Sequence, residues 1–294
     1  MIKLRLAENF RAVFYAPFYA TLALGHFASE GLDVTLVDSG APGGGPADLV
    51  KGSVDVTWGG PMRVMRYRDQ GGPDLVCFCE VVRRDPFYLV GRARAGSFDL
   101  RSLSELGLGS VSEVPTPWLC LQQDLRDLGI DPERLSRVTD RTMAANLAGL
   151  SRGDIDVAQV FEPFADEALS AGFAILYAQS SRGPTSYTTF TTTPERMHRN
   201  REGFTRMTRA MARMQTWLSG NTADELARAV ASFFPSIPRN RLARSFQRYI
   251  EARLWADDTD VSRDGFARLG MSLRSGGFIA NLPQYDACVV NLPL

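Results

Sequence analysis

Two glycine clusters flank one predicted helix–strand unit near the N-terminus, and together they could bind a small molecule. Gly43, Gly44 and Gly45 precede the helix, and Gly59 and Gly60 follow the strand. Glycines let backbone amide groups converge on an oxygen-rich ligand, and helix N-termini attract anions. Ligands of open α/β sheets bind beyond the carboxyl ends of strands. Either cluster alone would indicate an ordinary tight turn, but the pair favours noncovalent binding of a small molecule.

The loop after the first predicted strand, and the helix after it, add polar and aromatic side chains to this region. Arg11 could contact a ligand, although an arginine in a loop is as often exposed to solvent. Phe14 and Tyr15 could stack on a ligand or belong to the core. Trp58 stands at a strand end, where the alternative is burial in the core. Besides the glycines above, the candidate binding residues here are Asn9, Arg11, Phe14, Tyr15, Ser39, Gly40, Trp58 and Met62.

A second region, residues 110–118, has a similar organisation. Ser112 ends a predicted strand, and Thr116 opens a helix whose free amide groups could hold an acceptor-rich ligand. Glu113 would repel a simple anion, so it could instead accept hydrogen bonds from an amine or a ring nitrogen, or face solvent. Glu162, at another strand end, has the same ambiguity. The candidate binding residues here and on the later segments are Ser112, Glu113, Thr116, Trp118, Glu162 and Tyr187.

The sequence contains no arrangement typical of a catalytic centre, so we predict no catalytic residues. His26 and His198 both fall on predicted helices, away from the loops at strand ends. Cys79 lies near Glu80 and Arg83, whose charges could change the pKa of its thiol. A cysteine within a predicted strand is nevertheless more often buried and inert. The cysteines and histidines also lack zinc-site spacing, and we expect neither a metal nor a cofactor.

The composition excludes several classes of partner. Among the 294 residues, 33 are Lys or Arg and 33 are Asp or Glu, so no net field attracts nucleic acid or an anionic membrane. No stretch is long and apolar enough to span a bilayer. We therefore expect a small-molecule ligand, no nucleic acid and no direct membrane insertion.

The apolar segment after Arg11, AVFYAPFYATLALG, has the character of a signal-peptide core. A strand-like segment precedes it, Pro17 interrupts it, and residues 28–31 end it as a helix would end. We interpret it as part of the fold. If a signal peptide preceded the numbered chain and was removed, the protein would be periplasmic or otherwise extracytoplasmic; otherwise it would be cytoplasmic.

The order of the predicted elements is that of two α/β lobes. Strands and helices alternate from Lys3 to Val82, which favours a parallel sheet with covering helices. A second α/β set follows, and from Pro194 onward the pattern is nearly all helical. We predict an α/β fold with mixed sheets covered by helices and two crossover strands that permit hinge closure. Lobe 1 would comprise residues 1–85 and 190–294, and lobe 2, inserted in it, residues 86–189.

Six short segments follow one another in an order that is typical of one family. They are Phe14–Pro17, His26–Val34, Gly52–Val56, Phe161–Pro163, Gly276–Ile279 and Tyr285–Asp286. On these segments nearly the whole chain resembles the nitrate/sulfonate/taurine-type solute-binding family of ABC transport systems. The resemblance implies the two-lobed type II periplasmic-binding fold. The same superfamily includes pyrimidine-precursor binders and the thiamine pyrimidine synthase.

This resemblance implies a solute-binding protein that captures a small organic ligand between its lobes for an ABC transporter permease. A sulfonate, a carboxylate or a heteroaromatic compound such as a pyrimidine would fit that role. The alternative is an enzyme on the same scaffold, such as a decarboxylase, a desulfinase or a thiamine pyrimidine synthase-like protein. The cysteine cluster and the lysine that are central to the pyrimidine synthase have no counterpart here. A ligand-sensing domain of a regulator is a third hypothesis.

Overall fold

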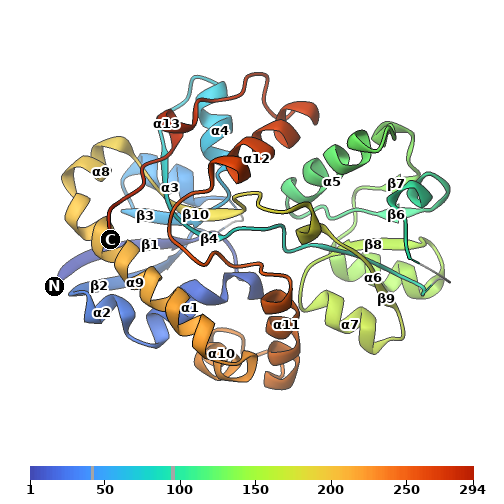
Figure 1. The fold of residues 1–294 in the computed structure, drawn as a ribbon, viewed down its shortest axis with the longest axis horizontal. Coiled ribbons are helices and arrows are strands. Elements are labelled where there is room, and N and C mark those ends of the chain that lie inside the picture. The colour runs from blue at the N-terminus through green and yellow to red at the C-terminus, as the bar shows by residue number, and fades with distance from the viewer. Residues whose placement is uncertain (41–42, 94–96) are drawn as a thin grey trace.

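The computed structural model describes residues 1–40, 43–93 and 97–294, which contain two sheets flanked by helices (Figure 1). The strand order of the first sheet is β2-β1-β3-β10-β4. Strand β1 pairs in parallel with β2 and β3, whereas β10 runs antiparallel between β3 and β4. The strands are β1 (Ile2–Glu8), β2 (Leu32–Asp38), β3 (Val56–Gly59), β4 (Val76–Val82) and β10 (Thr188–Thr192).

The second sheet has the order β7-β6-β8-β5-β9. Strand β6 is parallel to β7 and β8, and β5 is antiparallel to β8 and β9. Each sheet therefore combines parallel strands with one antiparallel strand next to a crossover. The strands are β5 (Tyr88–Gly91), β6 (Leu108–Gly109), β7 (Arg137–Val138), β8 (Val157–Val160) and β9 (Ala174–Ala178).

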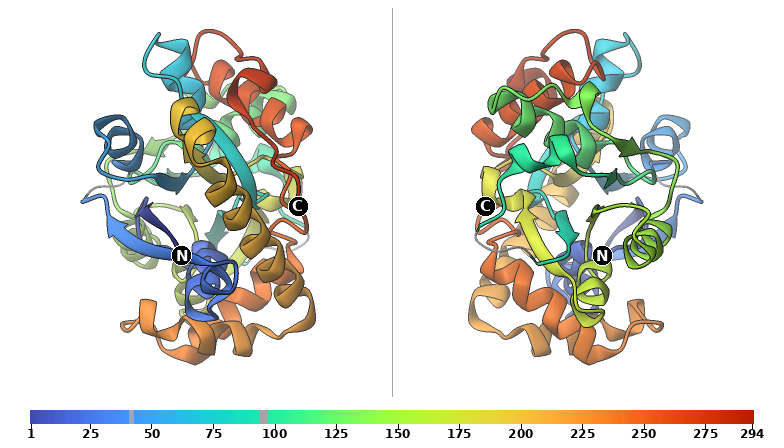
Figure 2. Two further views of the ribbon diagram at one scale, coloured as in Figure 1. Left: turned by 90° about the vertical axis from the view of Figure 1, so that its left-hand side faces the viewer. Right: turned by 90° about the vertical axis from the view of Figure 1, so that its right-hand side faces the viewer.

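The helices divide between the two sheets, which lie side by side in Figure 1 and are seen from either end in Figure 2. Those before the second sheet are η1 (Val13–Tyr15), α1 (Ala16–Ala23), α2 (His26–Ser29), α3 (Gly45–Lys51) and α4 (Met62–Asp69). Those within it are η2 (Leu100–Glu105), α5 (Thr116–Asp127), η3 (Pro132–Arg134), α6 (Met143–Arg152), α7 (Phe164–Ser170) and η4 (Gln179–Arg182). The C-terminal ones are α8 (Pro194–Arg199), α9 (Arg201–Gly220), α10 (Ala223–Val230), η5 (Ala231–Phe233), α11 (Arg239–Glu251), α12 (Arg263–Ser275) and α13 (Tyr285–Cys288).

Local sequence explains where several helices begin and end. Helix α10 begins with a capping box, in which Thr222 accepts from the Glu225 amide group and the Glu225 carboxylate accepts from the Thr222 amide group. Residues 16–29 form two helices, α1 and α2, and not one continuous helix. Gly25, with a φ of 72°, introduces a left-handed residue between them.

Two mixed sheets covered by helices confirm the predicted fold class. The chain leaves the first sheet between β4 and β5 and returns between β9 and β10. The division into a lobe of residues 1–85 with 190–294 and an inserted lobe of residues 86–189 stays a prediction about which parts move as units.

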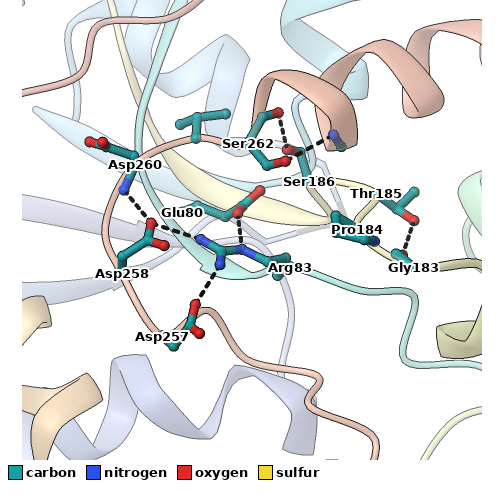
Figure 3. Close-up of polar contacts among 12 residues, drawn as sticks. Glu80, Arg83, Gly183, Pro184, Thr185, Ser186, Asp257, Asp258, Asp260 and Ser262 are labelled. Carbon is teal, nitrogen blue, oxygen red and sulfur yellow. Dashed lines mark hydrogen bonds and ion pairs between the residues drawn. The ribbon is translucent and has the colours of Figure 1, made fainter.

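A C-terminal segment, residues 254–262, anchors both crossovers (Figure 3). The Arg83 guanidinium donates to Glu80 at 2.7 Å, to Asp257 at 2.5 Å and to Asp258 at 2.8 Å. On the returning crossover, the Ser186 hydroxyl donates to the backbone oxygen of Ser262 at 3.2 Å. The position at which the chain changes sheets is thus fixed by hydrogen bonds from a third segment.

An ion cluster joins α7 of the second sheet to α11. Glu162 and Asp166 are both almost completely buried. Arg248 bonds both carboxylates, at 2.5 Å to Glu162 and 2.8 Å to Asp166, and Arg244 binds Asp166 through two hydrogen bonds. Burial alone would raise the pKa of Asp166, but the hydrogen bonds from Arg244 and Arg248 outweigh it and lower that pKa. The cluster therefore favours the ionised form of Asp166.

We expect Arg248→Met to lower the free energy of unfolding by roughly 3 kcal/mol, because it leaves two buried carboxylates short of a partner. The exposed pair of Arg199 with Glu195 offers the control, Arg199→Met, for which a change of about 0.5 kcal/mol or less is expected. Urea denaturation measures both. Because the folded pKa of Asp166 is lowered, its contribution is complete above its unfolded pKa and is lost as the pH falls through the folded pKa. Equal losses in the two variants near neutral pH, or a difference between them that does not shrink in strong acid, would contradict this account.

Candidate functional site

A small cavity lies between the two sheets, next to the crossovers. Its volume is about 30 Å³, enough for about one water molecule. Residues from both sheets and from the returning crossover form its wall, so a ligand there would contact both halves of the structure. The lining residues are Asn9, Phe10, Phe14, Tyr15, Gly60, Met62, Arg63, Phe87, Val114, Pro115, Thr116 and Tyr187.

Asn9 organises the polar wall on the side of the first sheet. Its amide nitrogen donates to the Tyr15 hydroxyl at 3.0 Å, and its amide oxygen accepts from the Gly43 backbone at 2.8 Å. Burial raises the pKa of Tyr15 to about 12, so the phenol stays neutral near pH 7. The predicted glycine loop thus holds Asn9 in place from behind the cavity instead of lining it.

Arg63 supplies a positive charge to the cavity wall. It lies in the first turn of α4, and its guanidinium packs against Gly43, where a Cβ atom would lie 2.2 Å from Cζ. Within residues 1–40, 43–93 and 97–294 it forms no ion pair. Burial lowers the pKa of Arg63, but an arginine remains charged in a protein. A cationic group in a cavity without a carboxylate partner is suited to binding an anion.

Arg63 is not among the binding residues that the sequence predicts, although it lines the cavity. The sequence offers three arginines on one short helix, Arg63, Arg66 and Arg68, and such a run is typical of a solvated surface. The position of Arg63 in the sequence could have identified it. It follows Met62 in the first turn of α4, directly after the second glycine cluster, where the helix begins at the strand ends.

The opposite wall comes from the second sheet and the returning crossover. Thr116 lies in the first turn of α5, and its hydroxyl is 2.6 Å from the Met62 sulfur, so the two sides already touch across the cleft. The Tyr187 hydroxyl is buried and has no hydrogen-bond partner in the described part of the chain. Burial raises the pKa of Tyr187 well above its usual value. It is therefore a neutral hydroxyl available to a ligand.

The structure brings seven of the predicted binding residues together around the cavity: Asn9, Phe14, Tyr15, Gly60, Met62, Thr116 and Tyr187. Others lie close behind them. Gly43 donates to Asn9, Gly44 precedes α3, and a Cβ atom at Gly59 would be 3.9 Å from the Asn9 side chain. Ser39 and Gly40 follow β2, an edge strand of the first sheet, and are not among the lining residues.

Both predicted glutamates hold other parts of the fold together. The Glu113 carboxylate is exposed and accepts at 2.9 Å from the Met143 amide group at the start of α6, while its neighbour Ser112 donates to the backbone oxygen of Arg141. Glu162 is fully occupied by the α11 cluster, where Ser245 also donates to it at 2.9 Å. The structure therefore gives neither carboxylate a place in the cavity wall.

Arg11 lies outside the cavity. Its guanidinium forms two 2.7 Å hydrogen bonds with Glu8 and lies over the rings of Tyr19 and Phe233, at 5.4 and 5.9 Å from their centroids. The hydrogen bonding of the Arg11 guanidinium to the Glu8 carboxylate, the largest cause, raises the pKa of Arg11 despite partial burial. Arg11 is thus already paired with an anion, unlike Arg63.

The two tryptophans that we predicted to bind a ligand are both buried in hydrophobic clusters. Trp58 is 1% exposed and stacks on Phe18 with ring centroids 4.6 Å apart. Trp118 is buried beneath Arg137, whose guanidinium lies 4.0 Å from its ring centroid. Neither lines the cavity, because each side chain points from its strand or helix into the hydrophobic interior.

Trp58→Ala should lower the free energy of unfolding by about 3–5 kcal/mol, since it removes a fully buried aromatic ring from the first sheet's core. The half-buried Trp217 on α9 provides the control, Trp217→Ala, which should cost markedly less. Unfolding in urea, followed by circular dichroism, compares them. A stable Trp58→Ala protein that has lost ligand binding would instead return Trp58 to the binding site.

The thiols and imidazoles do not form a reactive centre. The four cysteines are free and buried. Burial raises the pKa of Cys77 and of Cys120 to about 12 and raises that of Cys79 still further, because Glu80 adds repulsion. Burial, followed by the charge of Arg213, lowers the pKa of His26 on α2. Thiolate chemistry is therefore disfavoured at Cys79.

In the native protein near neutral pH, we expect very slow reaction of all four thiols with a chromogenic disulfide reagent. Their raised pKa values keep the reactive thiolate scarce until strongly alkaline pH, and burial blocks access. Guanidinium chloride should release the four thiols quickly. A fast native thiol that disappears in Cys79→Ser would overturn this expectation.

No group of three or more His, Cys, Asp or Glu side chains gathers as metal ligands would in the ranges that the structure describes. None of the helices in those ranges combines the length and the apolar character needed to cross a bilayer.

Comparison with known proteins identifies the family. The sequence pattern of the NMT1-like family matches residues 10–234. The chain belongs to the NMT1-like family. This stretch contains most of both sheets and every residue of the cavity wall except Asn9.

The relatives of this NMT1-like chain include binding proteins. It is 24% identical over 293 residues to "Putative binding protein YtlA" of Bacillus subtilis (strain 168), covering 98% of this chain and 88% of the relative. The periplasmic aliphatic sulphonate binding protein SsuA of Escherichia coli has the same fold, with a TM-score of 0.75 and 14% identity over 97% of this chain and 96% of that one. The periplasmic nitrate-binding protein NrtA of Synechocystis PCC 6803 gives a TM-score of 0.63 and 15% identity over 83% and 70%. These likenesses confirm the resemblance noted from the sequence and the periplasmic-binding fold.

Proposed function

We propose that this protein is a solute-binding protein that encloses a small organic anion between its two sheets. The observation that carries the proposal is the position of Arg63 in a cavity whose wall comes from both sheets. A ligand that contacts both sides stabilises the closed arrangement by its binding energy. Binding proteins rather than enzymes are also the relatives that this chain matches over most of its length.

The other lining groups support an organic ligand with a negatively charged end. The neutral hydroxyls of Tyr187 and Tyr15 can hydrogen-bond an oxygen-rich group beside Arg63, and charge-assisted bonds of this kind are strong. Phe14 and Phe87 offer apolar ring surface next to them. A sulfonate or a carboxylate satisfies this set better than an uncharged pyrimidine does.

The alternative, an enzyme on the same scaffold, has less support. Cys79 is buried in β4, and burial keeps its thiol protonated. Neither histidine is among the residues that line the cavity. The side chains that line the cavity are hydrogen-bond donors and aromatic rings. Such groups bind a ligand without reacting with it.

The partner and the location follow from the proposed role. We propose that the closed protein delivers its ligand to the permease of an ABC transporter and acts outside the cytoplasm. The names of similar structures support this, since they describe periplasmic proteins and a ligand-binding component of an ABC-type import system.

Arg63→Ala should weaken binding of the preferred anion roughly ten- to a hundredfold, because a charge-assisted hydrogen bond contributes about 1.5–3 kcal/mol. Isothermal titration calorimetry with pooled sulfonates, aromatic carboxylates and pyrimidines identifies the ligand and then measures the variant. Arg66→Ala, on the same helix but stacked on Phe278 at the surface, is the matched control and should bind normally.

Three results would count against the proposal. Equal losses in Arg63→Ala and Arg66→Ala would make the effect a general one on α4. Tight binding of an uncharged pyrimidine, with an affinity that Arg63→Ala does not change, would show that the ligand is not an anion. Consumption of a probe compound by the protein would favour the enzyme.

A further inference from the structure

A groove opens to the surface beside the cavity, at the ends of β1, β2 and β8. Its volume is about 570 Å³. Like the cavity, it takes its walls from both sheets. Residues 233–237, at the end of η5 and after it, form a further part of the wall. The residues that line it are Glu8, Phe10, Arg11, Ala12, Val13, Asp38, Phe161, Pro163, Phe164, Phe233, Phe234, Pro235, Ser236 and Ile237.

The cavity around Arg63 is too small for an organic anion as it stands. Its volume of about 30 Å³ accommodates only about one or two ligand atoms. Binding sites for small organic molecules have volumes of about 300 Å³ or more. Either the two sheets move apart to enlarge the cavity, or the ligand extends into adjoining space. The groove offers that space without separating the contacts between Met62 and Thr116.

The Phe10 side chain separates the cavity from the groove, because it lines both. It lies in the loop after β1 and is half-buried. Its ring centroid is 5.4 Å from that of Tyr15 on the cavity side and 6.5 Å from that of Phe161 on the groove side. Phe10 therefore lies between the cavity and the groove.

The groove suits an uncharged apolar group. Phe161 and Phe164 pack edge to face with centroids 6.0 Å apart on the wall from the second sheet, and Phe233 stands on the η5 loop. The charges at one end are Arg11 and Glu8, which are paired with each other, and Asp38, which is exposed. A second anionic group would meet these carboxylates, so the chemistry of the groove favours rings or alkyl chains.

We propose that the groove is a second compartment of the ligand site, which takes the apolar tail of an anion whose head is bound at Arg63, and that Phe10 moves aside to admit it. This inference rests on the proposed function. It adds a ligand class, amphiphilic anions with one charged end, and assigns Phe161, Phe164 and Phe233 to recognition of the tail.

A chain-length series tests the inference in the unmodified protein. Dissociation constants of methanesulfonate, butanesulfonate and octanesulfonate, with the corresponding carboxylates, are measured by calorimetry. Each buried methylene group should tighten binding roughly fourfold until the groove is full. A dissociation constant that does not change with chain length would overturn the inference, and would show that hinge opening or another occupant accounts for the groove.

Variants place the tail. Phe164→Ala should weaken octanesulfonate binding about tenfold and leave methanesulfonate binding nearly unchanged, since only the longer ligand reaches α7. Phe278→Ala, which removes a half-buried ring that is not among the lining residues of the groove, is the control for a general loss of packing. Phe10→Ala should raise the association rate of the long ligand by removing the partition. Loss of affinity for every chain length in Phe164→Ala, or the same chain-length dependence as the unmodified protein, would overturn the inference.

The two proposals fail in different ways. Binding of short anions through Arg63 without any dependence on chain length would leave the solute-binding function intact and remove the second compartment. Failure of every sulfonate and carboxylate to bind, with intact folding by circular dichroism, would overturn both.

Discussion

The return of the chain as β10, between β3 and β4, is the constraint on which the rest of the structure depends. All five residues of β10 are buried, and it pairs Phe190 with Trp58 on one side and with Phe78 on the other. This pairing brings the second crossover alongside the second glycine cluster, where a Cβ atom at Gly60 would lie 3.3 Å from the Tyr187 backbone oxygen. The cavity therefore lies where the chain returns from the second sheet and enters the first sheet between β3 and β4.

Within the residues that the structure describes, the charged side chains near the strand ends and crossovers divide into those that stabilise the fold and one that is free to bind a ligand. Glu8 is held by Arg11, Glu80 by Arg83, and Glu162 by Arg248. Each of these pairs lies at a strand end or a crossover, and each neutralises a buried carboxylate that would otherwise oppose folding. Arg63 differs because no carboxylate in the described ranges pairs with it, and desolvation without such a partner makes an incoming anion the natural counter-charge.

The sequence predicted the fold class and half of the cavity wall, and the reasons for its failures are physical. Period-two and helical patterns reveal elements, and strand ends mark the edge at which ligands bind, so Asn9, Tyr15, Thr116 and Tyr187 could be found. The patterns do not reveal which side chain another segment neutralises. Glu162 looked available because Arg248 is 86 residues away. Arg63 looked solvated because its packing partner, Gly43, belongs to a different segment of the chain. The burial of Trp58 in the core could not be foreseen for a related reason, since a strand's two faces cannot be assigned before its neighbours are known.

The order of the strands also bears on how the protein is made. Every strand of the second sheet lies between Tyr88 and Ala178, so that sheet is fully synthesised before β10 leaves the ribosome. The first sheet, in contrast, lacks the strand between β3 and β4 until then, and the 254–262 segment that anchors the crossovers arrives later still. During translation the inserted unit can therefore fold first, while the segment that begins the chain waits with exposed strand edges on β3 and β4. Those edges, rather than any surface of the finished protein, are where a nascent chain of this kind would need a chaperone.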